Sequence, residues 1–317
     1  MKSEDIKDVV VYGTGAIGSV IATFLQDHNL SKAEEQRKNI KLVGRERIFR
    51  KIKENGLSYI PYDENNEKIH TEGYELYTNI KDIKSADLIF LTMKAHNLKE
   101  SLDTADHLLK NNPYVFITMN GLGLKDIIKD YVDEEKIIEC IVNYPSHLEG
   151  NTVKNSGGNS NFMVKETENP PVDKLIGSLF NQDKFDIRIV NDFYLKQWKK
   201  AIMNIGMNGI SAITMMKVGE VLERKTLGRI IKHLIREAIK VANKEGIEFD
   251  EDMIEYFWKF AGRDPTHKTS TLQDIERDKP TEVEFMNGYI VKRAKDFNLE
   301  MPANRAIFTL MRLVEEQ

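Results

Sequence analysis

The sequence predicts an α/β protein in two parts: an N-terminal part built on a mostly parallel sheet and an all-helical C-terminal part. In the first half, short apolar runs of strand length alternate with amphipathic stretches, which is the pattern of βαβ units. After about residue 191, glycine becomes sparse and apolar residues recur with helical spacing. We therefore place a boundary near residue 190 and predict domains over residues 1–190 and 191–317.

The strands expected in the N-terminal part are short runs rich in β-branched and aromatic residues. They cover residues 9–12, 40–43, 88–92, 114–118 and 137–142, with late edge strands at 162–164 and 187–190. A helix is expected over residues 17–26, after the glycine cluster that ends the first strand. Residues 31–39 are expected to form a loop, and the Asn- and Gly-rich residues 150–158 a turn region.

The helices expected in the C-terminal part cover residues 193–208, 226–244, 283–298 and 303–314. The second of these has apolar residues at intervals of three and four, and Gly246 follows it as a stop signal. The histidines are scattered and form no spaced pair near carboxylates, so no metal site is predicted.

Composition narrows the class of protein. The chain has 317 residues, of which 41% are hydrophobic, enough for a core in two domains. Its 46 basic and 50 acidic residues give a net charge of −4, which argues against a general nucleic-acid binder. No apolar run approaches the roughly 20 residues of a membrane span. The N-terminus lacks the apolar segment of a secretory signal, and the single Cys140 cannot form an internal disulfide. We expect a cytoplasmic protein with no nucleic-acid or membrane partner.

A glycine motif follows the first expected strand and opens the first expected helix. It matches G-x-G-x-x-G and consists of Gly13, Thr14, Gly15, Ala16, Ile17 and Gly18. In a Rossmann domain the first glycine permits the turn, the second lets the backbone approach a pyrophosphate, and the third allows close packing of helix and strand. The amides and dipole of the helix N-terminus then favour the phosphate charge. The motif predicts a Rossmann dinucleotide-binding domain.

The residue after the second strand predicts which dinucleotide is bound. NAD enzymes usually have Asp or Glu there, to bond the ribose 2′-hydroxyl. Here Arg45 occupies the position, and a guanidinium group can pair with a 2′-phosphate. We therefore predict NADP (NADPH) as the cofactor. The alternative is that Arg45 is a surface residue and that Glu46 or Arg47 faces the ribose.

Three residues predict a functional face on the helix over 193–208. Lys200, Asn204 and Asn208 follow one another at intervals of four, so they share one side of the helix. A lysine and two carboxamides in a row are unusual for a face that packs into a core. An ordinary solvated polar face is the alternative.

Several spaced motifs, in order, resemble the ketopantoate reductase (2-dehydropantoate 2-reductase) family from residue 9 to about residue 312. They begin with the glycine motif and Lys94, which follows the third strand. Residues 120–123 then read N-G-L-G, and Trp198 opens the pattern that contains Lys200. Residues 270–275 read S-T-L-Q-D-I, followed by Thr281-Glu282 and Asn287-Gly288.

The resemblance implies a fold, a reaction and residue roles. The fold is a Rossmann domain joined to a helical domain, and the reaction is the NADPH-dependent reduction of ketopantoate to pantoate, a step in pantothenate and coenzyme A biosynthesis. Lys200 matches the proton donor to the ketone oxygen, and Glu282 matches a glutamate that contacts substrate and cofactor. The resemblance further implies substrate binding by Asn204, Asn208 and Ser270, and cofactor binding by Arg45, Lys94, Asn120, Ser146 and Glu282.

The expected chemistry agrees with these residue types. Hydride delivery to a keto carbon leaves negative charge on the oxygen, which a positioned lysine can stabilise and protonate. From the residues alone, Glu282 could equally be a solvated glutamate at a helix start, and Ser270 a helix cap.

The sequence departs from the family pattern at three places. Gly209 stands where proline is usual, Val218 stands where some members have asparagine, and Tyr144 and Pro145 precede Ser146 where small residues are common. These changes leave the hydride chemistry intact and put the substrate in doubt. The alternatives are a reductase of another 2-keto acid or opine-type substrate, and an NADP-binding sensor without turnover. A homodimer is expected by analogy only.

Overall fold

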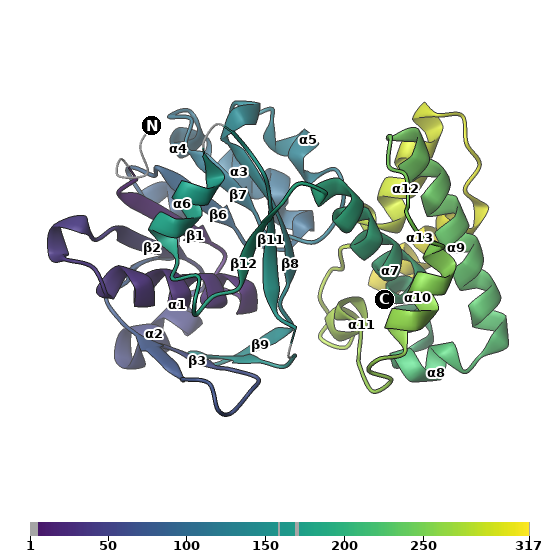
Figure 1. Cartoon of the computed structure of the whole chain (residues 1–317), viewed down its shortest axis with the longest axis horizontal. Helices are drawn as coiled ribbons and strands as arrows, with labels where there is room; N and C mark the ends of the chain where they lie inside the picture. Colours follow the sequence, from purple (N-terminus) through teal and green to yellow (C-terminus); the bar gives the residue numbers. More distant parts are fainter. Residues whose placement is uncertain (1–5, 158, 169–170, 317) are drawn as a thin grey trace. The chain divides into compact units, whose positions relative to one another are not determined.

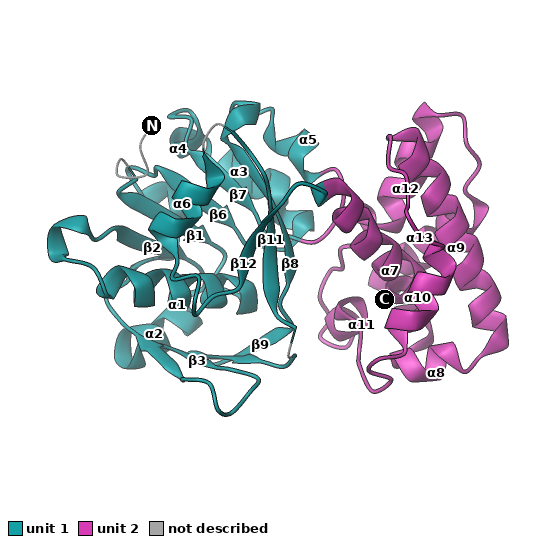
Figure 2. Cartoon of the chain, viewed as in Figure 1, with its two compact units in different colours: residues 1–119, 124–193 teal, residues 120–123, 194–317 magenta. Residues whose placement is uncertain are grey.

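The computed structural model describes residues 6–157, 159–168 and 171–316. It divides the chain into two compact units (Figure 2). Unit 1 comprises residues 1–119 and 124–193, and unit 2 comprises residues 120–123 and 194–317. The short segment 120–123 thus belongs to the second unit although the chain on both sides of it belongs to the first.

Unit 1 is built on an eight-stranded sheet with the order β12-β11-β8-β7-β6-β1-β2-β5. Its strands are β1 (Asp8–Tyr12), β2 (Asn39–Val43), β5 (Glu75–Tyr77), β6 (Leu88–Leu91), β7 (Tyr114–Ile117), β8 (Ile137–Asn143), β11 (Asn161–Lys165) and β12 (Ile187–Val190). All neighbours are parallel except β11 and β8. From β5 to β8 the order is that of a Rossmann fold, with the topological switch point between β1 and β6, where ligands bind at the carboxyl ends of the strands.

Helices connect the strands of unit 1 along the chain (Figure 1). They are α1 (Ala16–Leu30), α2 (Glu46–Asn55), α3 (Leu98–Thr104), α4 (Asp106–Leu109), α5 (Leu124–Ile128) and α6 (Val172–Leu179). Helix α1 contributes Val20, Ile21, Phe24 and Leu25 to the same apolar core as strand residues such as Val9 and Leu88. Burial of these side chains is the main force that holds helix and sheet together.

A second, four-stranded sheet packs against α1, with the order β4-β3-β10-β9. Its strands are β3 (Leu57–Ile60), β4 (Ile69–Thr71), β9 (Ser146–Glu149) and β10 (Thr152–Asn155). The prediction of a turn region over residues 150–158 was therefore wrong for 152–155. These residues form a strand because β10 pairs with β3 and β9. The side chain of Val153, in the middle of β10, is fully buried.

Unit 2 is helical. Its helices are α7 (Phe193–Thr214), α8 (Val218–Leu222), α9 (Lys225–Lys244), α10 (Met253–Ala261), α11 (Ser270–Ile275), the short 3-10 turn η6 (Val283–Phe285), α12 (Asn287–Asp296) and α13 (Pro302–Glu315). The predicted α/β class with a helical C-terminal part is confirmed. The single helix expected over 283–298 is broken at Met286, whose φ and ψ angles are −122° and −97°. No helix among the described residues is long and apolar enough to cross a membrane.

A buried polar network ties four helices of unit 2 together. The Glu237 carboxylate in α9 accepts hydrogen bonds from the backbone amides of Ala303 and Asn304, at 2.9 and 2.8 Å, and so caps the start of α13. The Asn304 side chain accepts from Asn287 of α12 at 2.9 Å, and the Asn287 amide also donates to the carbonyl oxygen of Ile205 in α7. The network connects α13 to α7, the helix that carries Lys200.

Candidate cofactor and catalytic sites

The glycine motif follows β1 and opens α1, as predicted, and so lies at the switch point of the unit 1 sheet. Gly13 ends β1 with a φ of +117°, and a Cβ atom there would lie 2.9 Å from the Met93 amide nitrogen. A Cβ atom at Gly18 would lie 1.9 Å from the carbonyl oxygen of Gly13. The Thr92 hydroxyl donates a hydrogen bond to that same carbonyl. The first and third glycines are therefore required by the packing of the turn itself.

The second glycine of the motif is not required by the protein. Gly15 has a φ of −89°, which any residue can adopt. A Cβ atom there would lie within 4 Å of no described residue other than its neighbours in the chain. Helix α1 begins next, at Ala16 and Ile17, with no side chain capping its first amides and no acidic residue in its first turn. The open space beside free amides and a positive helix end fits a phosphate group.

The loop after β2 presents Arg45 next to this turn. Thr14 is buried, and its hydroxyl donates to the carbonyl oxygen of Val43 at 3.0 Å, so its side chain joins the two loops. A Cβ atom at Gly44 would lie 2.6 Å from the Thr14 hydroxyl. Arg45 follows as the exposed N-cap residue of α2. The Glu46 carboxylate, the alternative ribose ligand, pairs with Arg50 at 2.8 Å. Arg45 at the end of the loop and Arg47 in the first turn of α2 are exposed cations.

The other predicted cofactor residues of unit 1 also follow carboxyl ends of strands. Lys94 comes after β6, on the far side of the switch point from β2, and is partly buried. Ser146 follows β8 and opens β9 of the small sheet, where its hydroxyl donates to the carbonyl oxygen of Tyr144 at 3.4 Å. Gly13, Arg45 and Lys94 thus follow the carboxyl ends of β1, β2 and β6, and Ser146 lies three residues after the end of β8.

In unit 2, three predicted residues from distant parts of the chain meet. The Lys200 ammonium in α7 donates to the Asn120 carboxamide oxygen at 2.8 Å. The Asn120 amide nitrogen faces the Glu282 carboxylate at 3.5 Å. Glu282 is only 4% exposed, so it is not the solvated helix-start glutamate of the alternative interpretation. A cation, a carboxamide and a carboxylate thus form one short chain, named here the Lys200 cluster.

Two aromatic residues that the sequence did not single out contact the turn that carries Asn120. Gly121 and Gly123 have φ angles of +118° and +76°, and Cβ atoms there would lie 2.5 Å from Phe285 and 2.7 Å from the Tyr289 ring. The Leu122 amide donates to the carbonyl oxygen of Phe285 at 2.9 Å. The two glycines were the only signal in the sequence, because a glycine in such a turn indicates that another residue packs closely against it. They do not indicate which residue that is.

The remaining predicted residues differ in accessibility. Asn204 is partly buried on the same face as Lys200, whereas Asn208 is buried and its amide contacts the Met286 sulfur at 3.8 Å. Ser270 is exposed at the start of α11. The cap of α11 is Thr269, whose hydroxyl accepts from the Leu272 amide at 3.2 Å, so the alternative of Ser270 as the cap was wrong.

The three departures from the family pattern lie in packed regions. Tyr144 is buried in the core of unit 1, and its hydroxyl lies 2.6 Å from that of Tyr59. Desolvation raises the pKa of this phenol. Val218 is 5% exposed in the core of unit 2. A Cβ atom at Gly209 would lie 2.5 Å from Ile307. Each of these three residues thus packs against neighbours within its own unit.

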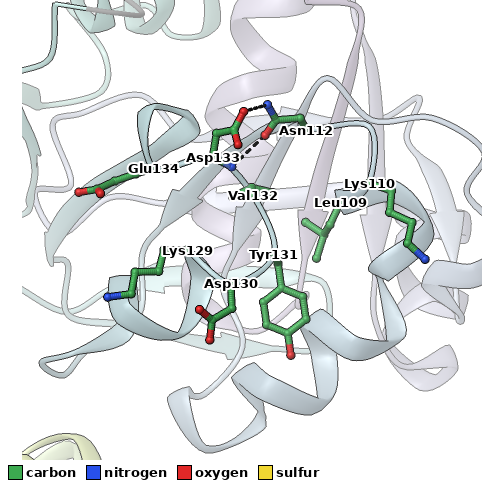
Figure 3. Close-up of a pocket in the computed structure, with 9 residues that line it drawn as sticks. All are labelled: Leu109, Lys110, Asn112, Lys129, Asp130, Tyr131, Val132, Asp133 and Glu134. Carbon is green, nitrogen blue, oxygen red and sulfur yellow. Dashed lines mark hydrogen bonds between the residues drawn. The ribbon is translucent and has the colours of Figure 1, made fainter.

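A surface cavity of about 670 Å³ is lined by other residues of unit 1 (Figure 3). It is lined by the loops around α4 and α5, where Asn112 and Asp133 bond to each other. None of the predicted site residues lines it. Among the described residues, no group of three or more His, Cys, Asp and Glu side chains could hold a metal ion.

Comparison with protein families matches both parts of the chain. Residues 9–169 match the model described as ketopantoate reductase PanE/ApbA, and residues 192–315 match the model of its C-terminal part. A 2-dehydropantoate 2-reductase of Pyrococcus abyssi is 28% identical over 307 residues, 96% of each chain. One of Pyrococcus horikoshii is 28% identical over 328 residues, 97% of each chain.

Solved structures share the fold over nearly the whole chain. A PanE/ApbA family ketopantoate reductase from Ralstonia eutropha has a TM-score of 0.84 at 20% identity, covering 98% of each chain. D-mandelate dehydrogenase, solved with NADH and anilino(oxo)acetate, has a TM-score of 0.83 at 23% identity and the same coverage. A dimeric ketopantoate reductase from Staphylococcus aureus has a TM-score of 0.76 at 21% identity, covering 98% of this chain and 99% of the other.

Proposed function

Because the chain belongs to the ketopantoate reductase family of oxidoreductases, we propose that it reduces 2-dehydropantoate to pantoate with NADPH. The observation that carries the proposal is the Lys200 cluster, in which a lysine ammonium is held 2.8 Å from a carboxamide oxygen beside a buried carboxylate. A protein that only binds a nucleotide needs no such oriented proton donor.

NADPH would be held by the residues at the carboxyl edge of the unit 1 sheet. The free amides after Gly15 would take the pyrophosphate, and Arg45 would pair with the 2′-phosphate. When bound, NADPH supplies the hydride. Gly15 supports this assignment because its missing side chain leaves open space that no contact within the protein explains.

The residues of the Lys200 cluster would then stabilise the developing charge on the substrate and supply the proton. As negative charge develops on the keto oxygen, Lys200 stabilises it and transfers a proton from Nζ to that oxygen. Asn120 orients the ammonium through its carboxamide oxygen. The buried Glu282 carboxylate, which faces the Asn120 amide, can accept a hydrogen bond from a substrate hydroxyl. Asn204 and Ser270 are the accessible candidates for substrate binding, and Asn208 would support them from a buried position.

The test is NADPH oxidation with ketopantoate by the wild type, Lys200→Ala and Lys199→Ala. Lys199 is a matched control, since it is the neighbouring lysine and is bound by Asp250 and Glu251 at 2.7 Å each. We expect Lys200→Ala to lose at least a hundredfold in kcat while retaining NADPH binding, and Lys199→Ala to keep kcat within threefold. Equal activity of the two variants would remove Lys200 as the proton donor.

A second candidate substrate is another 2-keto acid. This candidate is favoured by the structural likeness to D-mandelate dehydrogenase, because the same fold therefore occurs in an enzyme with a different substrate name. Turnover of a panel of aliphatic and aromatic 2-keto acids, compared by kcat/KM, separates the two. NADPH binding without turnover of any of them would favour the sensor. The dimeric relative from Staphylococcus aureus supports a homodimer, which sedimentation would test.

A further inference from the structure

The exposed face of α9 carries a row of six cations. The α9 cation row consists of Lys225, Arg229, Lys232, Arg236, Lys240 and Lys244, all of them exposed. Successive members are three or four residues apart, so the row occupies about a third of the helix circumference. At a rise of 1.5 Å per residue, it extends for about 28 Å along one straight element.

Nothing in the described part of the chain neutralises this row. None of its six members forms an ion pair with a described carboxylate, whereas other surface cations, such as Lys199 and Arg293, do. The only acidic residue within α9 is Glu237, which is 7% exposed and directs its oxygens to α13. Glu245, just after the helix, is bound by Tyr289 and Arg293.

The arrangement is electrostatically unfavourable for an isolated helix. Like charges at i and i+4 repel, and a mixture of Glu and Lys would give equal solubility with attraction instead. Helix α9 forms because its opposite face is buried: Ile231, Leu234 and Ile235 are each 0% exposed. The cations are therefore not needed to form the helix, and the repulsion among them would be relieved by an anionic partner.

We propose that the α9 cation row binds the phosphate backbone of double-stranded nucleic acid without reading its sequence. A duplex is a stiff, straight polyanion with closely spaced charges, which matches a straight, rigid row of cations. The helix contains no Phe, Tyr or Trp that could stack on the unpaired bases of a single strand. Its large apolar side chains other than Ile230, which is 36% exposed, are at least partly buried in unit 2 and so unavailable to enter a lipid interface.

The net charge of the whole chain does not contradict this assignment. The net charge of −4 is a sum over all 317 residues. Helix α9 alone has six basic residues and one acidic residue, a formal charge of +5. Phosphate binding depends on the local field, which falls off within about 10 Å at 0.1 M salt. The same field disfavours α9 as a contact between two copies of the chain, because identical cation rows would face each other.

The experiment measures binding of a fluorescently labelled 24-base-pair duplex DNA by anisotropy between 50 and 200 mM KCl. Because each neutralised phosphate contributes a slope of about −0.9 in log K against log salt, six contacts predict a slope of about −5. The triple variant Lys232→Glu, Arg236→Glu, Lys240→Glu is expected to bind at least thirtyfold more weakly at 50 mM KCl. Its slope should be shallower than about −3.

The matched control is Lys68→Glu, Lys81→Glu, Lys84→Glu, which makes the same change in net charge at three exposed lysines of unit 1. We expect it to weaken binding less than threefold. Equal losses in the two triple variants, or no wild-type binding at 50 mM KCl, would overturn the proposal. So would tighter binding to phosphatidylserine vesicles or to single-stranded DNA than to the duplex. If the Glu variant fails to fold, the corresponding triple Gln variant tests the same loss.

Discussion

The Nζ atom of Lys200 lies 2.8 Å from the Oδ1 atom of Asn120, a residue 80 positions earlier in the chain. The partner is neutral, so it orients the ammonium group without compensating its charge. If Lys200 is the proton donor, Asn120 determines where the donated proton points. Under the proposed mechanism, the turn at 120–123 would therefore have a catalytic role distinct from cofactor binding.

Asn120→Ala should lower kcat by about ten- to a hundredfold, because the ammonium loses its orientation. The KM for NADPH should change less than threefold. Steady-state kinetics with ketopantoate and NADPH measure both. A raised KM with unchanged kcat would instead make Asn120 a ligand of the cofactor alone.

Gly15→Ala and Gly18→Ala should have opposite effects. A Cβ atom at Gly15 meets open space, so its variant should keep Tm within about 2 °C while binding NADPH at least tenfold more weakly. A Cβ atom at Gly18 meets the Gly13 carbonyl at 1.9 Å, so its variant should lose several degrees of Tm, consistent with about 1–3 kcal/mol for overpacking. Thermal melting and NADPH fluorescence titration give both quantities. Unchanged NADPH affinity of Gly15→Ala would move the phosphate site elsewhere.

Arg45→Glu should reverse the preference for NADPH over NADH, since a carboxylate repels the 2′-phosphate and bonds to the ribose hydroxyl instead. We expect NADPH to bind at least thirtyfold more weakly and NADH no more weakly than before, by fluorescence titration. Arg47→Glu, at an exposed position in the first turn of α2, is the control, with an expected change below threefold for either nucleotide. Reversal in Arg47→Glu alone would show that Arg47 faces the ribose.

Gly209→Ala should destabilise unit 2 by about 1–3 kcal/mol, because the new methyl group would meet the Ile307 Cγ2 atom at 2.5 Å. Ile307→Leu keeps the size of the side chain and removes Cγ2, so the double variant should recover at least half of the loss. Urea denaturation of the two single variants and the double variant closes the cycle. Strict additivity would show that the two side chains do not contact each other.

The sequence predicted the eight-stranded sheet better than the small one, for a physical reason. Strands such as β1 and β6 are continuous apolar runs, since both faces are buried, and they are visible locally. Strands β3 and β10 are four residues long, and they pair across about 95 positions of the chain. Such short strands owe their conformation to distant partners, which a local sequence pattern does not contain.

The helix break at Met286 has the same origin. Residues 283–298 keep a helical apolar pattern, but the Phe285 carbonyl oxygen accepts from Leu122 instead of continuing a helix. The roles of Phe285 and Tyr289 could not be predicted, because they depend on which residues face Gly121 and Gly123. The meeting of Lys200, Asn120 and Glu282 could be expected only through the family resemblance, since their separations of 80 and 162 residues leave no local signal.

The membership of residues 120–123 in unit 2 bears on how such chains can recombine. A single crossover near residue 190 would exchange the helices α7 to α13 but would retain the first parent's Asn-Gly-Leu-Gly turn. That turn would then have to fit a foreign Phe285 and Tyr289, with 2.5 and 2.7 Å between their atoms and any added Cβ. Chimeras should therefore fold when positions 120–123, 285 and 289 come from the same parent. These six residues must be exchanged together, although they are far apart in the sequence.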